Sequence, residues 1–191
     1  RRHVQRYVDS LHHSHPGFQL TSNWAFSSMM PEPVSLPLDF LSGDLQPQGS
    51  LYSAAFESRV LASQGKPWDL MAWSFTWSPE RTIATQTKTA VQLQQEMAEV
   101  IAMGGGVHVY FRQNPDLSYQ PWALPLMGQL ADFARARQAW CHQARPVPQV
   151  ALLYSGESYL EEIDDLYPEW SPRLQPLKGL MMALLDRQYS V

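Results

Sequence analysis

Two acidic residues, Asp44 and Glu57, have positions that suit catalysis. Asp44 belongs to a Ser-Gly-Asp segment that directly follows an apolar run, and Glu57 lies in the helical pattern after it. Cleavage of a glycosidic bond needs two carboxyl groups, one that protonates the leaving oxygen and one that attacks or activates water. Asp44 also suits a turn or a helix cap, and Glu57 also suits a solvated or ion-paired position. A third carboxylate, Asp69, stands inside an apolar run, where we expect a structural hydrogen bond.

Polar and aromatic residues follow the ends of the expected strands. In parallel α/β folds, ligands meet the loops after the carboxyl ends of the strands. Aromatic rings there can stack on a sugar ring, while amide and guanidinium groups bond to its hydroxyls. The 7 Trp and 8 Tyr also suit a large α/β core, so the aromatic content by itself leaves both roles open. The expected substrate-binding residues are Asn23, Trp24, Trp73, Tyr110 and Arg112.

Other site chemistries find little support. Cys141 is the only cysteine, which excludes a disulfide framework and a cysteine-based zinc site. His12, His13 and His15 cluster without a carboxylate at metal-binding spacing. The glycines at 104–106 follow a helix rather than a strand, so they suit a helix end better than a phosphate loop. We therefore expect neither a metal nor a cofactor.

Composition limits the partners. The 191 residues include 14 Lys+Arg against 18 Asp+Glu, a formal net charge of −4, which argues against binding to a nucleic-acid backbone. With 45% hydrophobic and 17% charged residues the chain can bury a core, yet no apolar run approaches the roughly 18 residues that span a bilayer. We expect partners other than nucleic acid or membrane.

Strand and helix patterns alternate along the chain, which favours a parallel sheet with crossover helices. An amphipathic helix is expected to end near Leu11, and Gly104 is placed to end another helix in the left-handed conformation. The strands are expected at Phe18–Trp24, Leu38–Leu41, Trp68–Phe75, Val107–Arg112 and Gln149–Tyr154, and the helices at Leu51–Ser63, Lys88–Met103, Trp122–His142 and Pro176–Gln188.

The prolines near Arg145–Pro148 mark the expected domain boundary. Residues 1–145 hold four strand–helix units, about half of an eight-fold barrel, which predicts the C-terminal half of a (β/α)8 TIM barrel. Residues 146–191 predict the beginning of a doubly wound flavodoxin-like domain. The chain starts within a helix and stops before an expected strand, so we expect an internal piece of a longer protein.

The segments LDFLSGD (38–44), KPWDLMAWSFTW (66–77) and 88–111 resemble, in order and content, the alpha-L-fucosidase-like glycoside hydrolases and the related group of hypothetical glycosyl hydrolases. Asn23 and Trp24 resemble the family's Asn-x-Arg-Trp element. Asp39–Asp44 is similar to Asp-Tyr/Phe-x-Thr-Pro-Glu, and Pro67–Asp69 to Pro-Trp-Glu. The fourth element, a Lys and a helix ending in Gly-Gly, is matched by Lys88 and Gly104–Gly105.

This resemblance covers about residues 18–140 and implies a retaining glycosidase that acts on an alpha-L-fucoside-like or related sugar. The family's nucleophilic aspartate would lie upstream of residue 1. Its acid/base glutamate is matched by Asp44, a shorter side chain, with Glu57 as the competing candidate. Residues 149–191 resemble the flavodoxin-like, glutamine-amidotransferase-like domain of such proteins, which implies self-association through it and, without a cysteine there, no catalysis.

Two other function classes stay open at this point. A carbohydrate-binding or scaffold protein on a degenerate barrel is favoured by Ser-Gly-Asp standing where the family has Thr-Pro-Glu. A redox or nucleotide enzyme on the doubly wound part would need a glycine fingerprint after Tyr154, where only Gly156 stands.

Overall fold

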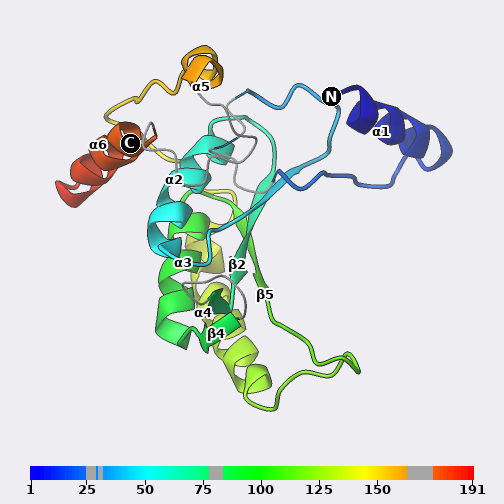
Figure 1. Ribbon diagram of the computed structural model, residues 1–191, viewed down its shortest axis with the longest axis vertical. Helices are drawn as coiled ribbons and strands as arrows, with labels where there is room; N and C mark the ends of the chain where they lie inside the picture. The colour runs from blue at the N-terminus through cyan, green and yellow to red at the C-terminus, as the bar shows by residue number, and fades with distance from the viewer. Residues whose placement is uncertain (25–28, 30–31, 78–83, 163–173) are drawn as a thin grey trace.

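The computed structural model describes residues 1–24, 29, 32–77, 84–162 and 174–191 (Figure 1). They form six helices and five strands. The helices are α1 (Arg2–Ser14), α2 (Ser50–Ala62), α3 (Ala90–Ala102), α4 (Ala123–Cys141), α5 (Gly156–Glu162) and α6 (Gln175–Asp186), and the strands are β1 (Leu41–Asp44), β2 (Trp68–Trp73), β3 (Phe75–Trp77), β4 (Ala84–Thr87) and β5 (Gly106–Tyr110).

The central sheet is parallel and has the strand order β1-β2-β5. Leu41 pairs with Trp68, and Asp69 pairs with Gly106. An isolated parallel bridge between Asn23 and Ser42 adds a further chain segment beside β1. Each strand therefore lies next to its successor, with α2 and α3 as the crossovers, which confirms the expectation of an α/β fold with a parallel sheet.

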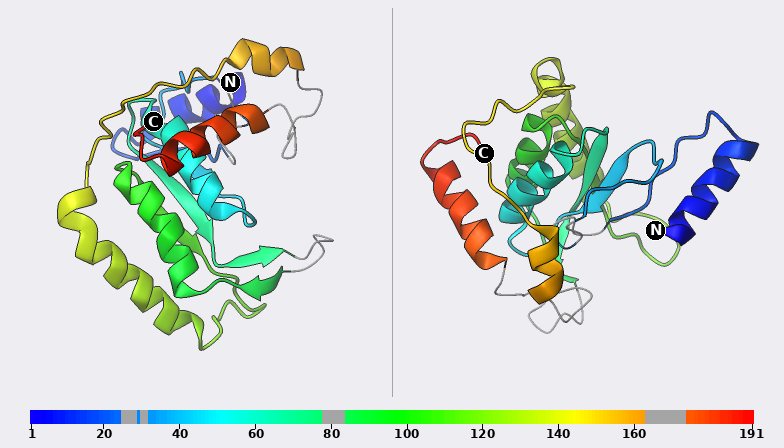
Figure 2. Two further views of the ribbon diagram at one scale, coloured as in Figure 1. Left: turned by 90° about the vertical axis from the view of Figure 1, so that its left-hand side faces the viewer. Right: turned by 90° about the horizontal axis from the view of Figure 1, so that it is seen from above.

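Alternation along the strands separates the two faces of this sheet. In β2 the side chains of Trp68, Leu70 and Ala72 are buried, while the residues between them are partly exposed. The buried set packs with the inner sides of α2, α3 and α4 into the main hydrophobic core. Figure 2 shows these helices on one side of the sheet and α1 on the other. The strand residues that face away from the three helices are partly or fully exposed, and we call this side of the sheet the open face.

The turn between α3 and β5 is fixed by two glycines. Gly104 has φ +82°, and the amides of Gly104 and Gly105 donate to the carbonyls of Ile101 and Val100, a Schellman ending. A Cβ on Gly105 would lie 2.3 Å from the ring of Trp68, and one on Gly104 would lie 2.0 Å from the carbonyl oxygen of Ala144. The predicted helix end at Gly104 is confirmed.

A hairpin, β3–β4, is inserted between β2 and α3 and was not expected from the sequence. It is anchored to the sheet because the amide of Ser74 donates to Tyr110 and the amide of Lys88 donates to Ser74. Beyond it, the Lys88 side chain enters the layer between α2 and α3. There its Nζ lies 2.9 Å from Glu96 Oε1 and 3.0 Å from Ser50 Oγ, and Ser50 Oγ donates to Glu96 at 2.5 Å.

Two expected strands in the N-terminal part of the chain differ from the structure. The strand expected at Leu38–Leu41 lies at Leu41–Asp44 instead, because Leu38 packs with Val8 and Leu36 beside α1. Over 18–24, all described residues, the chain forms only the single bridge at Asn23. Its other hydrogen bonds to the segment 39–42 are scattered ones, made through side chains and isolated amides.

The C-terminal segment packs against α2, not against the sheet. Met181 of α6 contacts Ala55 and Phe56 in a separate hydrophobic cluster. The strand expected at Gln149–Tyr154 is absent from these described residues, where the amides of Gln149 and Val150 both donate to the carbonyl of Ser190 instead of forming a ladder. Within the described residues, no helix is long and apolar enough to cross a membrane.

Candidate functional site

The open face of the sheet gathers the titratable and aromatic side chains of three parallel strands. Asp44 of β1 is in register with Met71 of β2, which is in register with His108 of β5. The next row along the strands pairs Trp73 with Tyr110. Because partners in a parallel ladder point to the same side, these residues share one surface. It lies at the carboxyl ends of the strands, where α/β folds bind ligands.

Asp44 is the last residue of β1, not a loop residue as the sequence pattern suggested. Its carboxylate is half-buried, and Asn23 Nδ2 donates to its Oδ1 at 3.3 Å. Burial raises the pKa of Asp44 above its usual value, and the bond from Asn23 and the nearby His108 oppose that rise. A carboxyl group with a raised pKa is better suited to donate a proton near neutral pH.

His108 on β5 interacts with two carboxylates of this surface. Its Nδ1 lies 3.8 Å from Oδ1 of Asp69, and it also lowers the pKa of Asp44. The ring is about half exposed, at 49%, so it is accessible to a ligand on the open face. Sequence analysis missed His108 and gave Asp69 only a structural role, since each is hidden within an apolar run. The signal that could have found them is the alternation of side chains along β2 and β5, which turns Asp69 and His108 away from the buried apolar residues of the same strands.

Three aromatic rings lie next to the row formed by Asp44, Met71 and His108, which we call the acidic row. Trp73, Phe75 and Tyr110 contact one another edge to face, with ring centroids 5.3 to 5.5 Å apart. Trp73 and Tyr110, both partly exposed, are expected site residues that the structure does bring together. Their mutual contacts hold the rings in place, which prepares a rigid apolar platform at little entropic cost to a ligand.

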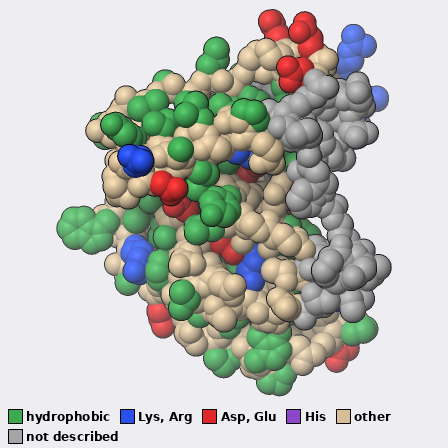
Figure 3. All heavy atoms as spheres, turned by 60° about the vertical axis from the view of Figure 1, so that its left-hand side comes forward, with side chains coloured by type: hydrophobic (Ala, Val, Ile, Leu, Met, Phe, Trp, Pro, Cys, Tyr) green, Lys and Arg blue, Asp and Glu red, His purple; other side chains and the backbone are tan. Residues whose placement is uncertain are grey.

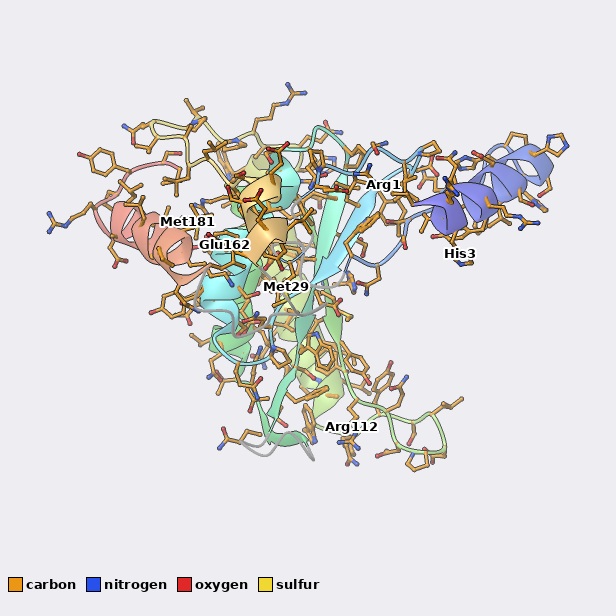
Figure 4. All side chains as sticks on the ribbon, turned by 45° about the horizontal axis from the view of Figure 1, so that its top comes forward. Arg1, His3, Met29, Arg112, Glu162 and Met181 are labelled. Carbon is orange, nitrogen blue, oxygen red and sulfur yellow. The ribbon has the colours of Figure 1, made fainter. Side chains whose placement is uncertain are left out.

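Arg112 continues the same alternation beyond β5. Phe111 is buried in the core, whereas Tyr110 and Arg112 on either side of it are not. Arg112 lines a cleft of about 530 Å³ between the β3–β4 hairpin and the loop 111–122. Figure 4 labels it where these two segments meet.

The remaining expected site residues lie elsewhere. Trp24 packs beside α1 against Val8 and Leu38, so the ring belongs to that cluster. Glu57 is on α2 and only 1% exposed. Burial raises the pKa of Tyr154 and Tyr159, and the charge of Glu57 adds to the rise in each, which places Glu57 near the C-terminal segment. Asn23 alone of the N-terminal pair reaches Asp44.

The helix-bearing side differs in chemistry from the open face. Figure 3 shows apolar side chains scattered over it among a few charged ones, and no histidine of the described residues comes into view. Larger hollows do occur there and at the amino ends of the strands, of about 740 and 1190 Å³. The first is lined mainly by apolar residues of α2 and the C-terminal segment. Neither hollow is lined by Asp44 or His108.

The described residues hold no group of three or more His, Cys, Asp or Glu side chains arranged to bind a metal ion. Comparisons of the chain with family models, with curated proteins and with solved structures gave no significant match. The functional argument therefore depends on the geometry of the open face.

Proposed function

We propose that the open face is part of the sugar site of a glycoside hydrolase and that Asp44 is its acid/base residue. The observation that carries the proposal is the position of Asp44, whose pKa is raised by burial, one row from the Trp73–Tyr110 pair. A carboxyl that holds its proton longer, beside rings that stack on a sugar, matches the needs of glycosidic cleavage.

The proposal includes a fold assignment. Successive strands are neighbours in the order β1-β2-β5, and their helices cover one face only. A sector of a (β/α)8 barrel has this arrangement, with its open face toward the barrel interior. The proposal also includes a second unit that begins near residue 146, supported by the bonds from the Gln149 and Val150 amides to the Ser190 carbonyl, which join the two ends of this segment.

In the proposed reaction Asp44 protonates the leaving oxygen and later removes a proton from water. The second carboxylate attacks the anomeric carbon, and the proposal places it on a strand outside residues 1–191, about 5–5.5 Å from Asp44 in the retaining mechanism. Asn23 orients the Asp44 carboxylate through the 3.3 Å bond. The aromatic rings hold the sugar ring, and an alpha-L-fucoside or related sugar is the proposed substrate.

The test is hydrolysis of chromogenic glycosides, with alpha-L-fucoside and beta-galactoside included, by the full-length protein. Loss of a general acid lowers turnover by about 10²- to 10⁴-fold, so Asp44→Asn should lose activity on that scale while Asn23→Ala loses less. Glu57→Gln is the matched carboxyl change away from the open face. A Glu57→Gln variant that loses turnover but keeps its fold, with Asp44→Asn active, would transfer the acid/base role to Glu57.

A non-catalytic carbohydrate-binding protein is the second candidate. The edge-to-face contacts of Trp73, Phe75 and Tyr110 favour it, because a rigid aromatic platform binds sugar without any acid. Sugar binding with no release from any glycoside, by a protein whose circular dichroism shows an intact fold, would support this candidate over the hydrolase.

A further inference from the structure

The open face extends past the aromatic platform to a cation. His108, Tyr110 and Arg112 follow one another on the same side of the β5 segment, because the residues between them point into the core side. At ~3.3 Å per residue, Arg112 lies ~13 Å along the chain from His108. A ligand that reaches from the acidic row to Arg112 must therefore pass over the rings of Trp73 and Tyr110.

Arg112 makes no hydrogen bond or ion pair with any described residue, although it lines a cleft. The nearby acidic side chain of its loop, Asp116, is occupied: the hydroxyl and the amide of Ser118 donate to it at 2.6 and 3.0 Å, and these bonds lower its pKa. Among the described residues that line the cleft, Arg112 is the only one with a charged side chain.

The rest of the lining is suited to hydroxyl groups. Besides Arg112, the described lining contains Ser74, the amides of Gln86, Gln113, Asn114 and Gln120, and the ring of Trp122. Gln120 Nε2 donates to Asn114 Oδ1 at 2.7 Å, which fixes these two amides against each other. Amides, a hydroxyl and an indole around a single guanidinium form a donor set for a sugar that also carries a negative charge.

We propose that this cleft binds an acidic sugar residue of the substrate, with the guanidinium of Arg112 paired to its carboxylate. The inference rests on the proposed function and deepens it, because it names the substrate class as a saccharide that contains a uronic acid. A guanidinium presents a planar fork of donors that fits a carboxylate with two parallel bonds. Trp122, 47% exposed, lies beside it to contact the sugar face.

The experiment is an NMR titration of the full-length protein with a panel of uronic-acid oligosaccharides and their neutral counterparts. The Nε–Hε signal of Arg112 reports contact at the cleft. We expect this signal to shift with the uronic-acid members and not with the neutral ones. Arg112→Gln should weaken binding of the acidic members by about 10- to 100-fold, the range of a charge-assisted hydrogen bond.

Arg135→Gln is the control, because Arg135 is exposed on α4 and pairs with Asp132. The inference is overturned if no acidic member shifts the Arg112 signal, or if Arg112→Gln and Arg135→Gln bind the acidic members equally. A shift with sulfated sugars alone would overturn the carboxylate assignment. Binding that depends on Arg112 without hydrolysis would refute only the hydrolase proposal, and hydrolysis of glycosides together with binding of the acidic members that does not depend on Arg112 would refute only this inference.

Discussion

The ion pair of Lys88 and Glu96 predicts a large and testable loss of stability. Both side chains are nearly inaccessible, at 3% and 2% exposed, and they share the hydroxyl of Ser50. Lys88→Met removes the cation and leaves the Glu96 carboxylate buried, still accepting the bond from the Ser50 hydroxyl. Removing one member of a buried pair costs about 3–5 kcal/mol, so the free energy of unfolding should fall by that amount at pH 7.

The loss should depend on pH in a defined direction. Burial already raises the pKa of Glu96, and the attraction to Lys88 opposes the rise. Without Lys88 the pKa of Glu96 in the folded variant is higher still. At pH values above the pKa of this carboxyl in the unfolded chain, the folded variant therefore binds more protons than the unfolded chain does. Stability of Lys88→Met then falls as pH rises through that range and is regained on acidification.

The double variant Lys88→Met/Glu96→Leu is the matched control. Apolar replacements of similar volume for both partners of a buried pair are often neutral or stabilising, so much of the loss should be recovered. Urea unfolding followed by circular dichroism, with unchanged m-values, measures each difference. A cost below ~1 kcal/mol for Lys88→Met, or a double variant less stable than the single one, would refute the argument from burial.

Three further changes test the turn, the site and a helix end. Gly105→Ala should cost about 1–3 kcal/mol in urea unfolding, since the added Cβ would overlap a buried ring, whereas Gly128→Ala, with open space around its Cβ, should not destabilise. Asn23→Ala should raise the pKa of Asp44, followed by carboxyl ¹³C NMR, because it removes a bond that lowers it; an unchanged or lower pKa would contradict the site geometry. Thr89→Ala removes the capping box of α3 and should cost about 1 kcal/mol, with Thr89→Ser close to the parent in the same unfolding assay.

The helices were largely predictable, because the face that each one buries is formed by residues three and four positions apart. For α3, the apolar face and the glycine end gave nearly the observed bounds, and α4 and α6 agree to within a few residues. The β3–β4 hairpin was not, since it lacks the Asn-Gly or Asp-Gly signal of a tight turn. The first central strand was displaced because an apolar run does not show which of its residues meets the sheet and which meets α1.

The site was predictable only where neighbours in sequence determine the surroundings. That Trp73, Tyr110 and Arg112 belong to the site follows from strand alternation and from the rule that ligands meet strand ends. Whether a helical glutamate faces solvent or the C-terminal segment depends on residues about a hundred positions away, so the burial of Glu57 had no local signal. The His108–Asp69 contact depends on strand register, which the sequence pattern does not fix.

The glycine turn after α3 divides the molecule into an end that is fixed and an end that can vary. At the amino ends of the strands, Gly105 packs against Trp68 and Gly104 lies against the carbonyl of Ala144, so a side chain added at either glycine disturbs a close contact. The loops at the opposite end, 46–49 and 112–122, begin after the buried Leu45 and Phe111 and leave the sheet pairing untouched when their length or composition changes. New ligand preferences can therefore arise by insertion and substitution beside the open face, while the packing at the other end keeps the strands in register.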